Sequence, residues 1–115
     1  MGKIPMKTIQ QQEIHLVPFP FSDLSRSKIR PVLVVSNNQF NKTSKDVIVC
    51  AITSKINENS QKITTGALEF GTLFKESYIK PESLFKLNKD LIIKQIGTVN
   101  KTTFNETRKR VLKLF

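Results

Sequence analysis

The stretch SKIRPVLVVSNN, at residues 27–38, decides the fold class. Four apolar residues run without interruption from Val32 to Val35, and three polar residues follow them. A short apolar run that is rich in β-branched residues and bounded by turn-forming residues is typical of a buried strand. A fixed positive charge, Arg30, stands at the start of this strand, and Pro31 favours extended backbone angles at the residue before it.

The rest of the chain repeats this pattern of short strands separated by polar turns. Further strands are predicted at residues 13–21, 47–53, 66–70 and 91–99, and around residues 78–80 with a second apolar stretch after a turn. Prolines 18 and 20 favour an edge or an end for the first of these strands, and Gly97 is expected at a bulge in the last. Residues 22–28, 37–46 and 54–62 are predicted to be polar connections. Many short strands favour a small curled sheet or barrel.

The C-terminal segment follows a helical pattern instead. Residues 103–106, TFNE, match the S/T-x-x-E capping box and predict a helix start at Thr103. Apolar residues then recur at helical spacing over about 12 residues, which favours a stripe packed on the core. The stripe consists of Phe104, Val111, Leu112 and Phe115. Residues 1–11 are polar and are predicted to be a flexible extension, which leaves a single domain at residues 12–115.

The composition restricts the setting of the protein. The chain has 115 residues and one cysteine, Cys50, so it forms no disulfide within the chain. Cys50 lies in the apolar run VIVCAIT and is predicted to act as a small hydrophobic residue in a reducing, cytoplasmic setting. No apolar run approaches the roughly 20 residues that a membrane span needs, and the N-terminus lacks the apolar region of a signal peptide.

The charge predicts a polyanionic partner. Nineteen Lys and Arg residues oppose nine Asp and Glu residues, which gives a formal net charge of +10. Such a balance favours binding to nucleic acid or to an acidic protein. Charge alone does not separate RNA from DNA or from an acidic inhibitor, and it also fits a basic protein without any such partner.

Several kinds of chemistry are disfavoured. The single histidine, His15, stands at an alternating strand position and is expected to be a packed or rim residue. One histidine and one cysteine are too few for a structural zinc site. The carboxylates are scattered, without the spacing of a two-metal nuclease, and no phosphate-binding glycine loop is present. We therefore expect no cofactor and no metal.

Two strand ends carry the remaining polar groups. Arg30 precedes one apolar strand, and Thr53 and Ser54 follow the next. Consecutive strands usually pair antiparallel, which would bring Arg30 beside Thr53 on one rim of the sheet. A guanidinium next to hydroxyl groups is suited to bind phosphate. The alternative is that Arg30 forms a local salt bridge and Thr53 only ends its strand.

At this point the sequence resembles a known family. EIHLVPFPFSDLSRSKIRPVLVVSNN followed by DVIVCAITSK, with IGTV before the C-terminal helix, resembles the MazF/PemK-like toxins of toxin–antitoxin systems, over about residues 12–115. The resemblance implies a mainly β fold, a small SH3-like β-barrel with a C-terminal α-helix, that forms a homodimer. It implies a metal-independent endoribonuclease that cleaves single-stranded mRNA, often sequence-specifically. It also implies an acidic or partly disordered antitoxin that blocks the site.

The resemblance also implies site residues. Arg30 falls on the catalytic arginine of the family and Thr53 on its catalytic threonine, with Ser54 as the neighbouring hydroxyl. The segment IKPES offers Lys80 and Glu82 where some members carry a basic and an acidic site residue. Two departures stand out: the usual glycine before the first strand is Gln12, and the loop SDLSRSK lacks the histidine of some members. Further RNA contacts are predicted at Lys55, Arg26 and Ser27.

RNA cleavage of this kind would require a separate role from each of these residues. Arg30 would stabilise the extra negative charge of a phosphorane, and Thr53 would donate a hydrogen bond to the phosphate. Arginine is a poor base, so Glu82 is the candidate that takes the proton from the 2′-OH group. The products would be a 2′,3′-cyclic phosphate, or its opened form, and a 5′-OH end.

Two other functions fit parts of the sequence. A CcdB-like toxin would act on DNA gyrase through protein contacts and would need no phosphate site, which the paired RP and ITS segments disfavour. A non-catalytic RNA-binding module would bind RNA in a salt-sensitive manner without cutting it. Its usual stacking platform is disfavoured because the chain has eight Phe and one Tyr, most of them in apolar patterns that predict core positions.

Overall fold

The computed structural model describes residues 8–20, 27–73 and 75–115. The elements follow one another as β1 (Glu13–Pro20), β2 (Ser27–Val34), α1 (Asn38–Thr43), β3 (Asp46–Thr53), β4 (Gln61–Ile63), the 3-10 turn η1 (Thr65–Ala67), β5 (Leu68–Gly71), β6 (Ser77–Asn88), the 3-10 turn η2 (Lys89–Leu91), β7 (Lys94–Val99) and α2 (Lys101–Leu112). The fold is mainly β with a C-terminal helix, as predicted.

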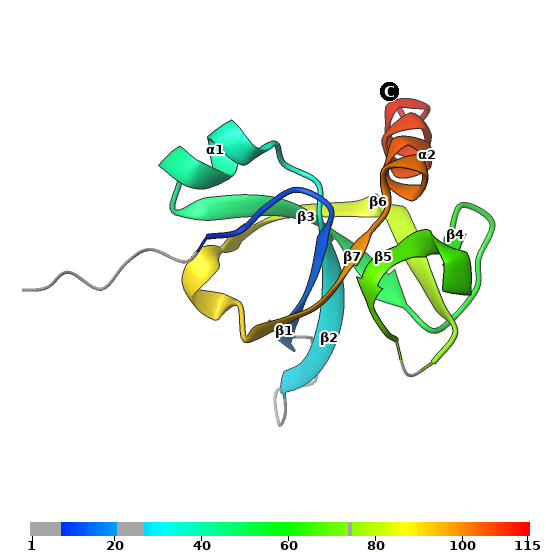
Figure 1. Ribbon diagram of the computed structural model, residues 1–115, viewed down its shortest axis with the longest axis horizontal. Helices are drawn as coiled ribbons and strands as arrows, with labels where there is room; N and C mark the ends of the chain where they lie inside the picture. Colours follow the sequence, from blue (N-terminus) through cyan, green and yellow to red (C-terminus); the bar gives the residue numbers. More distant parts are fainter. Residues whose placement is uncertain (1–7, 21–26, 74) are drawn as a thin grey trace, which may run out of the picture.

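The strands form one curled sheet. Their order is β4–β6–β3–β2–β1–β7–β5, and all neighbouring strands of this order pair antiparallel. The sheet bends round into a nearly closed barrel (Figure 1). Its two edge strands, β4 and β5, are consecutive in the sequence and are joined through η1. We call the gap between these two edges the seam.

The strands β2 and β3 are buried on both faces. Leu33 and Cys50 belong to one hydrophobic cluster, whereas the alternating neighbours Val32, Val34 and Val49 belong to a second. Because side chains of a strand alternate between faces, this arrangement needs apolar residues at consecutive positions. It explains why both strands are continuous apolar runs in the sequence.

The helix α2 closes the first cluster from outside the sheet. Phe104 is buried there, while Leu112 and Phe115 are 63 % and 91 % exposed, so only part of the predicted stripe joins the core. The predicted capping box is wrong. The helix begins at Lys101, and Asn100 is its N-cap, with its Oδ1 accepting a hydrogen bond from the amide of Thr103 over 2.9 Å. An Asn side chain satisfies an orphan amide as well as the predicted Thr does.

Glu106 serves the helix in another way. Its carboxylate accepts a 2.7 Å hydrogen bond from Arg110, one turn later. This bond lowers the pKa of Glu106 from its usual range. The predicted partner of Thr103 is therefore a surface ion-pair partner within the helix.

Other differences from the sequence prediction are local. The connection at residues 37–46 contains the short helix α1, whose N-cap Asn37 accepts from the amide of Phe40 over 2.8 Å.

The stretch from residue 77 to residue 88 is one strand, β6, with an irregularity in its pairing to β3. The predicted bulge lies next to Gly97, where the β1–β7 register shifts. Most of the phenylalanines were expected in the core, yet among the described residues Phe40, Phe70 and Phe115 are exposed.

The segment before β1 packs against the barrel. Ile9 is buried and belongs to the second hydrophobic cluster. Gln12, which stands where the related family usually has glycine, takes a backbone φ of 82°. Its side-chain amide donates a hydrogen bond to the carbonyl of Val99 over 2.8 Å, so the turn is held from the side chain as well. The division into an extension and a domain stays a prediction.

None of the helices in the described part of the chain has the length and the apolar character that crossing a membrane would require.

Candidate active site

An open cleft lies where β2 begins and β3 ends, and we call it the rim cleft. It has a volume of about 450 Å³. Its lining comes from β1, β2, β3, β6 and β7 and from the segment before β6: Leu16, Lys28, Ile29, Arg30, Pro31, Ile52, Thr53, Ser54, Leu73, Lys75, Ser77 and Ile96. Five strands of one sheet therefore contribute to the same hollow.

The strand register brings Arg30 and Thr53 to the same place. Val32 lies opposite Ala51 and Leu33 opposite Cys50 in the antiparallel β2–β3 pair. Continuing this register toward the start of β2 sets Arg30 opposite Thr53. Both residues line the rim cleft, together with Ser54. The expected meeting of Arg30 with Thr53 on one rim is thus present, and the catalytic roles of these residues stay a prediction.

The hydroxyl of Thr53 is oriented by the backbone. Its Oγ1 accepts a hydrogen bond from the amide of Lys55 over 3.1 Å. A hydroxyl has one proton to donate and two lone pairs. Because one lone pair is occupied by the Lys55 amide, the proton of Thr53 is available for an acceptor in the cleft, such as a phosphate oxygen.

The cleft is suited to bind an anion. Three of its lining residues, Lys28, Arg30 and Lys75, are cationic, and none of the lining residues is Asp or Glu. Lys28 lies two positions before Arg30 in β2, and residues two apart in a strand point to the same face. A guanidinium can hold two phosphate oxygens at once, while ammonium groups add charge. The arrangement favours a phosphodiester over a cation or an apolar ligand.

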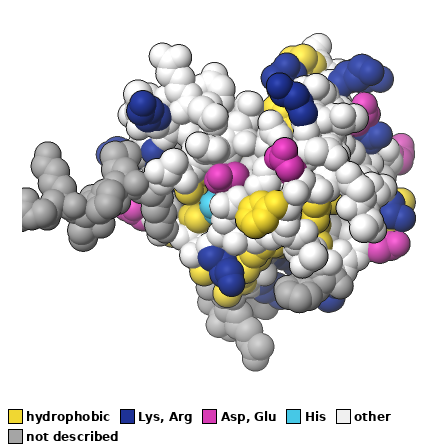
Figure 2. Space-filling view, in the orientation of Figure 1, with side chains coloured by type: hydrophobic (Ala, Val, Ile, Leu, Met, Phe, Trp, Pro, Cys, Tyr) yellow, Lys and Arg dark blue, Asp and Glu magenta, His cyan; other side chains and the backbone are white. Residues whose placement is uncertain are grey.

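Positive charge is not confined to this cleft. Figure 2 shows Lys and Arg side chains spread around one face of the molecule, with apolar side chains between them. The net charge alone therefore does not mark the site on this face. The rim cleft is distinguished by three cationic residues, Lys28, Arg30 and Lys75, together with hydroxyl groups and no carboxylate among its lining residues.

Several predicted site residues are not brought to the cleft. Lys55, Lys80 and Glu82 are absent from its lining. Glu82 instead lies close enough to Cys50 to contribute to its titration: burial, followed by the charge of Glu82, raises the pKa of the Cys50 thiol to about 12. This pKa agrees with Cys50 as an unreactive core residue. The carboxylate that was expected to act as the base is not among the residues that line the cleft.

Two further predictions concern the start of β2. Arg26 lies outside the described residues, and so does the side chain of Ser27, whose backbone begins β2.

His15 is buried at 4 % exposure, shares a 2.8 Å hydrogen bond with Glu13, and does not line the cleft. The expectation that it is a packed residue is correct.

Three polar lining residues, Lys28, Lys75 and Ser77, were not predicted from the sequence. Lys28 had a usable signal, because it shares a strand face with Arg30. Lys75 and Ser77 had none, since they reach the cleft through the pairing of β6 with β3, which joins segments distant in the sequence. Ser77 donates its hydroxyl to the carbonyl of Lys75 over 2.9 Å and so fixes the backbone there.

The described residues contain no group of three or more His, Cys, Asp or Glu side chains placed to hold a metal ion.

Comparisons with known proteins agree with this geometry. The model of the family described as PemK-like, MazF-like toxin of type II toxin–antitoxin system matches residues 10–115. Endoribonuclease MazF of Staphylococcus saprophyticus is 34 % identical over 90 residues, which are 76 % of this chain and 63 % of that protein. The chain thus spans less than two thirds of the length of this relative.

Solved structures share the fold. MazE–MazF from Deinococcus radiodurans superposes with a TM-score of 0.77 at 14 % identity, covering 94 % of this chain and 96 % of that one. An endoribonuclease in complex with its cognate antitoxin from a mycobacterial species gives a TM-score of 0.72 at 20 % identity, covering 94 % and 93 % of the two chains. The match to the family model extends over the whole barrel and helix, and the chain therefore belongs to the PemK-like, MazF-like toxin family of type II toxin–antitoxin systems.

Proposed function

We propose that this protein is a metal-independent, sequence-specific endoribonuclease that cleaves single-stranded mRNA. The observation that carries the proposal is the meeting of Arg30 and Thr53 in one cationic cleft without a carboxylate. Family membership supports it, because the endoribonuclease MazF is 34 % identical to this chain over the matched region. The rim cleft is the site at which we expect the phosphodiester to bind.

The reaction is a transesterification within the RNA. The 2′-oxygen forms a bond to phosphorus while the bond from phosphorus to the 5′-oxygen breaks. The 2′-OH group loses a proton and the leaving 5′-oxygen gains one, so the products are a 2′,3′-cyclic phosphate and a 5′-OH end. In between, the phosphorane carries more negative charge than the starting diester. The protein accelerates the reaction to the extent that it binds this extra charge more tightly than the substrate.

Arg30 is suited to this stabilising task. A guanidinium stays cationic at neutral pH and presents parallel donors to two oxygens. Thr53 adds a donor whose direction is set by the Lys55 amide, and the ammonium groups of Lys28 and Lys75 add charge. Fixed donors aimed at developing charge commonly provide the largest single contribution to catalysis.

Proton transfer then needs no carboxylate from the cleft lining. Glu82 does not line the cleft, and none of the residues that do is acidic. In this mechanism the proton leaves the 2′-OH group to water, and the 5′-oxygen takes one from water. The positive cleft favours loss of the 2′ proton because it stabilises the oxyanion that forms.

The proposal includes partners. Solved relatives of the same fold are complexes of MazF with MazE or of an endoribonuclease with its cognate antitoxin. We infer that a cognate antitoxin blocks this chain as well, and an acidic segment would complement its net charge of +10. We also infer that the chain forms a homodimer. The site of action would be the cytoplasm, where mRNA and a cytosolic antitoxin meet.

The test is cleavage of a long RNA in the presence of EDTA, followed by mapping of 5′-OH ends. The Arg30→Ala variant should lose about 10²- to 10³-fold in rate, as expected for loss of a preorganised donor. Arg30→Lys keeps the positive charge but lacks the parallel N–H donors of a guanidinium. Its cleavage rate should lie between the rates of the unmodified protein and of Arg30→Ala. Lys42→Ala removes an exposed cation from α1 and serves as the control for lost charge.

A second variant tests the role of the acid. Glu82→Gln should cleave at nearly the rate of the unmodified protein, since Glu82 does not line the cleft. Circular dichroism and urea unfolding establish that each variant is folded. Full activity in a folded Arg30→Ala protein would reject the proposed site. Absence of RNA cleavage together with inhibition of DNA gyrase would reject the ribonuclease and support the CcdB-like alternative.

A further inference from the structure

A second hollow occupies the seam between β4 and β5, and we call it the seam pocket. Its volume is about 430 Å³. Its described lining residues come from the end of β4, from η1 and β5, and from residues 72–73 and 75–76, which precede β6. The pocket exists because the sheet does not close at this point.

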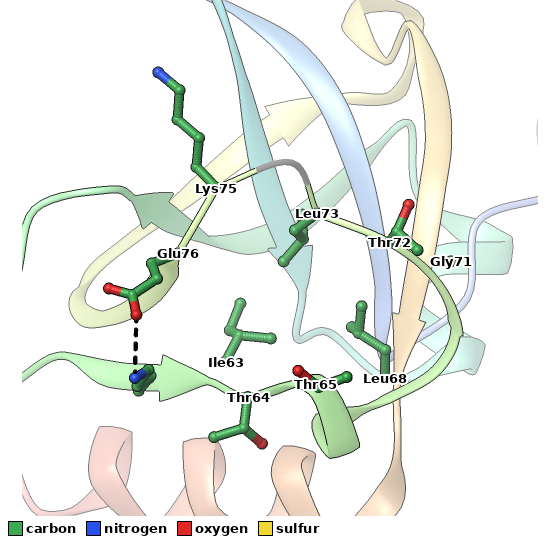
Figure 3. A pocket seen from close by; sticks show the side chains of 10 residues that line it. Ile63, Thr64, Thr65, Leu68, Gly71, Thr72, Leu73, Lys75 and Glu76 are labelled. Atoms are coloured by element: carbon green, nitrogen blue, oxygen red, sulfur yellow. Dashed lines mark ion pairs between the residues drawn. The ribbon is translucent and has the colours of Figure 1, made fainter.

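The inner walls of the seam pocket are apolar. Ile63 is buried at 7 % exposure, and Leu68 and Leu73 pack against the first hydrophobic cluster. Figure 3 shows these three side chains pointing toward one another from three different segments. Thr64 and Lys75 point away from this apolar space in the same view. Aliphatic walls on opposite sides are suited to hold the flat face of a nucleobase.

Polar groups stand at the edge of the same space. Thr65 and Thr72 line the pocket, and their hydroxyls make no hydrogen bond within the described part of the chain. A threonine hydroxyl can either donate or accept, so it can bond the edge of a base. The Lys62 ammonium lies 3.4 Å from the Glu76 carboxylate on one side of the pocket. This ion pair offsets the charge of Lys62, and the other lining cation, Lys75, points away from the apolar space, so that space is better suited to a neutral ring than to a phosphate.

The seam pocket adjoins the rim cleft. Leu73 and Lys75 line both hollows. An RNA strand whose phosphate is held by Arg30 therefore has an apolar pocket with hydroxyl edges beside it. Sequence-specific proteins generally read single-stranded RNA by holding unstacked bases in such pockets and bonding their edges.

Backbone contact fixes one wall of the seam pocket. Gly71, at the end of β5, has a φ of +92°, and a Cβ atom built there would lie 2.3 Å from the carbonyl oxygen of Ile96. The strands β5 and β7 thus approach too closely for any side chain at position 71. A pocket with a fixed wall discriminates between bases better than one that adapts, because a wrong base cannot be accommodated by movement.

We propose that the seam pocket binds the base of a nucleotide adjacent to the scissile phosphate, and that Thr65 and Thr72 determine which base is accepted. This inference rests on the proposed ribonuclease function, and it assigns the sequence preference to β4–η1–β5. Arg30 and Thr53 then govern how fast the bond is cut. The pocket hydroxyls govern where it is cut.

The experiment uses Thr65→Val and Thr72→Val, which remove a hydroxyl while nearly keeping the side-chain shape. Thr102→Val is the matched control, since Thr102 is an exposed threonine on α2, outside both hollows. Cleavage ends are mapped on one long RNA for all four proteins. At one position flanking the cut bond, we expect the preference for the favoured base to fall about tenfold in the pocket variants. The control should retain the preference of the unmodified protein.

A second measurement separates recognition from a structural effect. Oligonucleotides with a single abasic ribose at each flanking position are cleaved by the same proteins. Removing the base that occupies the pocket should slow the unmodified protein more than it slows Thr65→Val or Thr72→Val, because the two changes remove the same contact. Equal slowing at every position would overturn the inference.

The outcomes for the two proposals are distinguishable. If Arg30-dependent cleavage persists and both pocket variants keep the original base preference, the seam pocket assignment fails and the ribonuclease stands. If the pocket variants change only binding of the antitoxin, the pocket belongs to a protein partner and the inference is overturned. If the unmodified protein cuts no RNA, both proposals fall.

Discussion

Gln12 shows how hydrogen bonds can stabilise a backbone conformation that is unfavourable for residues other than glycine. Its φ of 82° lies in the left-handed region, which disfavours side chains other than glycine. Its amide donates to Val34, its carbonyl accepts from Val99, and its side chain donates to the Val99 carbonyl. Three hydrogen bonds thus tie this turn to β2 and β7. At this position the chain holds a left-handed backbone conformation by hydrogen bonds instead of by a glycine.

This explanation predicts the order of two substitutions at position 12. Gln12→Ala loses the side-chain hydrogen bond and keeps the strained φ, so it should destabilise the protein by about 1 kcal/mol. Gln12→Gly loses the same bond but relieves the strain, so it should be more stable than the alanine variant by about 1 kcal/mol. Urea unfolding of both variants measures the difference. An alanine variant that is the more stable of the two would contradict the conformation described for this turn.

At the same scale, the sequence predicted that two of the cleft residues would meet. Arg30 and Thr53 were predictable because two consecutive apolar strands usually pair antiparallel, and their polar ends then meet. The predicted role of Glu82 rested only on the short segment IKPES. Its actual surroundings depend on the irregular pairing of β6 with β3, and no local pattern encodes that irregularity. Sequence periodicity indicates which face a residue takes, but not which distant strand lies beside it.

The helix α2 shows the corresponding limit for an element. Its existence and its amphipathic character followed from the spacing of apolar residues, while its first residue was misplaced because two capping signals lie close together. Asn100 also donates its side-chain amide to the carbonyl of Gly66 over 2.8 Å. One residue therefore caps the helix and attaches it to η1. The short helix α1 escaped prediction because its sequence is polar and its stability comes from its cap and from the buried Asn41.

The cap assignment can be tested by mutation. Asn100→Ala should cost about 1–2 kcal/mol of unfolding free energy, because it removes the bond to the Thr103 amide and the bond to Gly66. Thr103→Ala should change stability by less than about 0.5 kcal/mol, since its side chain holds no cap. Chemical denaturation of the two variants is the measurement. The reverse order would restore Thr103 as the N-cap.

For the whole molecule, the exposed apolar side chains point to a second copy. Leu84 is 39 % exposed and Leu112 is 63 % exposed, and both border an apolar hollow of about 210 Å³ between α2 and the sheet. The neighbouring Leu114 and Phe115 are exposed as well. A stable dimer buries about 800 Å² on each partner, and apolar groups at its centre are typical. The surface next to α2 is where we place the homodimer contact.

The dimer has its own test. Sedimentation should show a dimer for the unmodified chain, and Leu84→Gln with Leu112→Gln should shift it toward monomer. Ile56→Gln is the matched control, because Ile56 is 73 % exposed but lies in the loop after β3. A monomeric unmodified protein at its highest attainable concentration would refute the homodimer. A control variant that dissociates equally would refute this surface.

With base preference assigned to the seam pocket and bond cleavage to the rim cleft, the open seam lets evolution vary these two properties independently. Arg30 and Thr53 stand at the ends of strands that are buried on both faces, where most replacements nearby would destabilise the fold. Thr65 and Thr72 lie at exposed positions beside a wall, β5, that Gly71 holds against β7, so new side chains there cost little stability. A gene duplicate of such a protein can acquire a new recognition sequence through a few tolerated substitutions while it inherits the cutting machinery unchanged. Diversification of targets on one barrel requires no new fold.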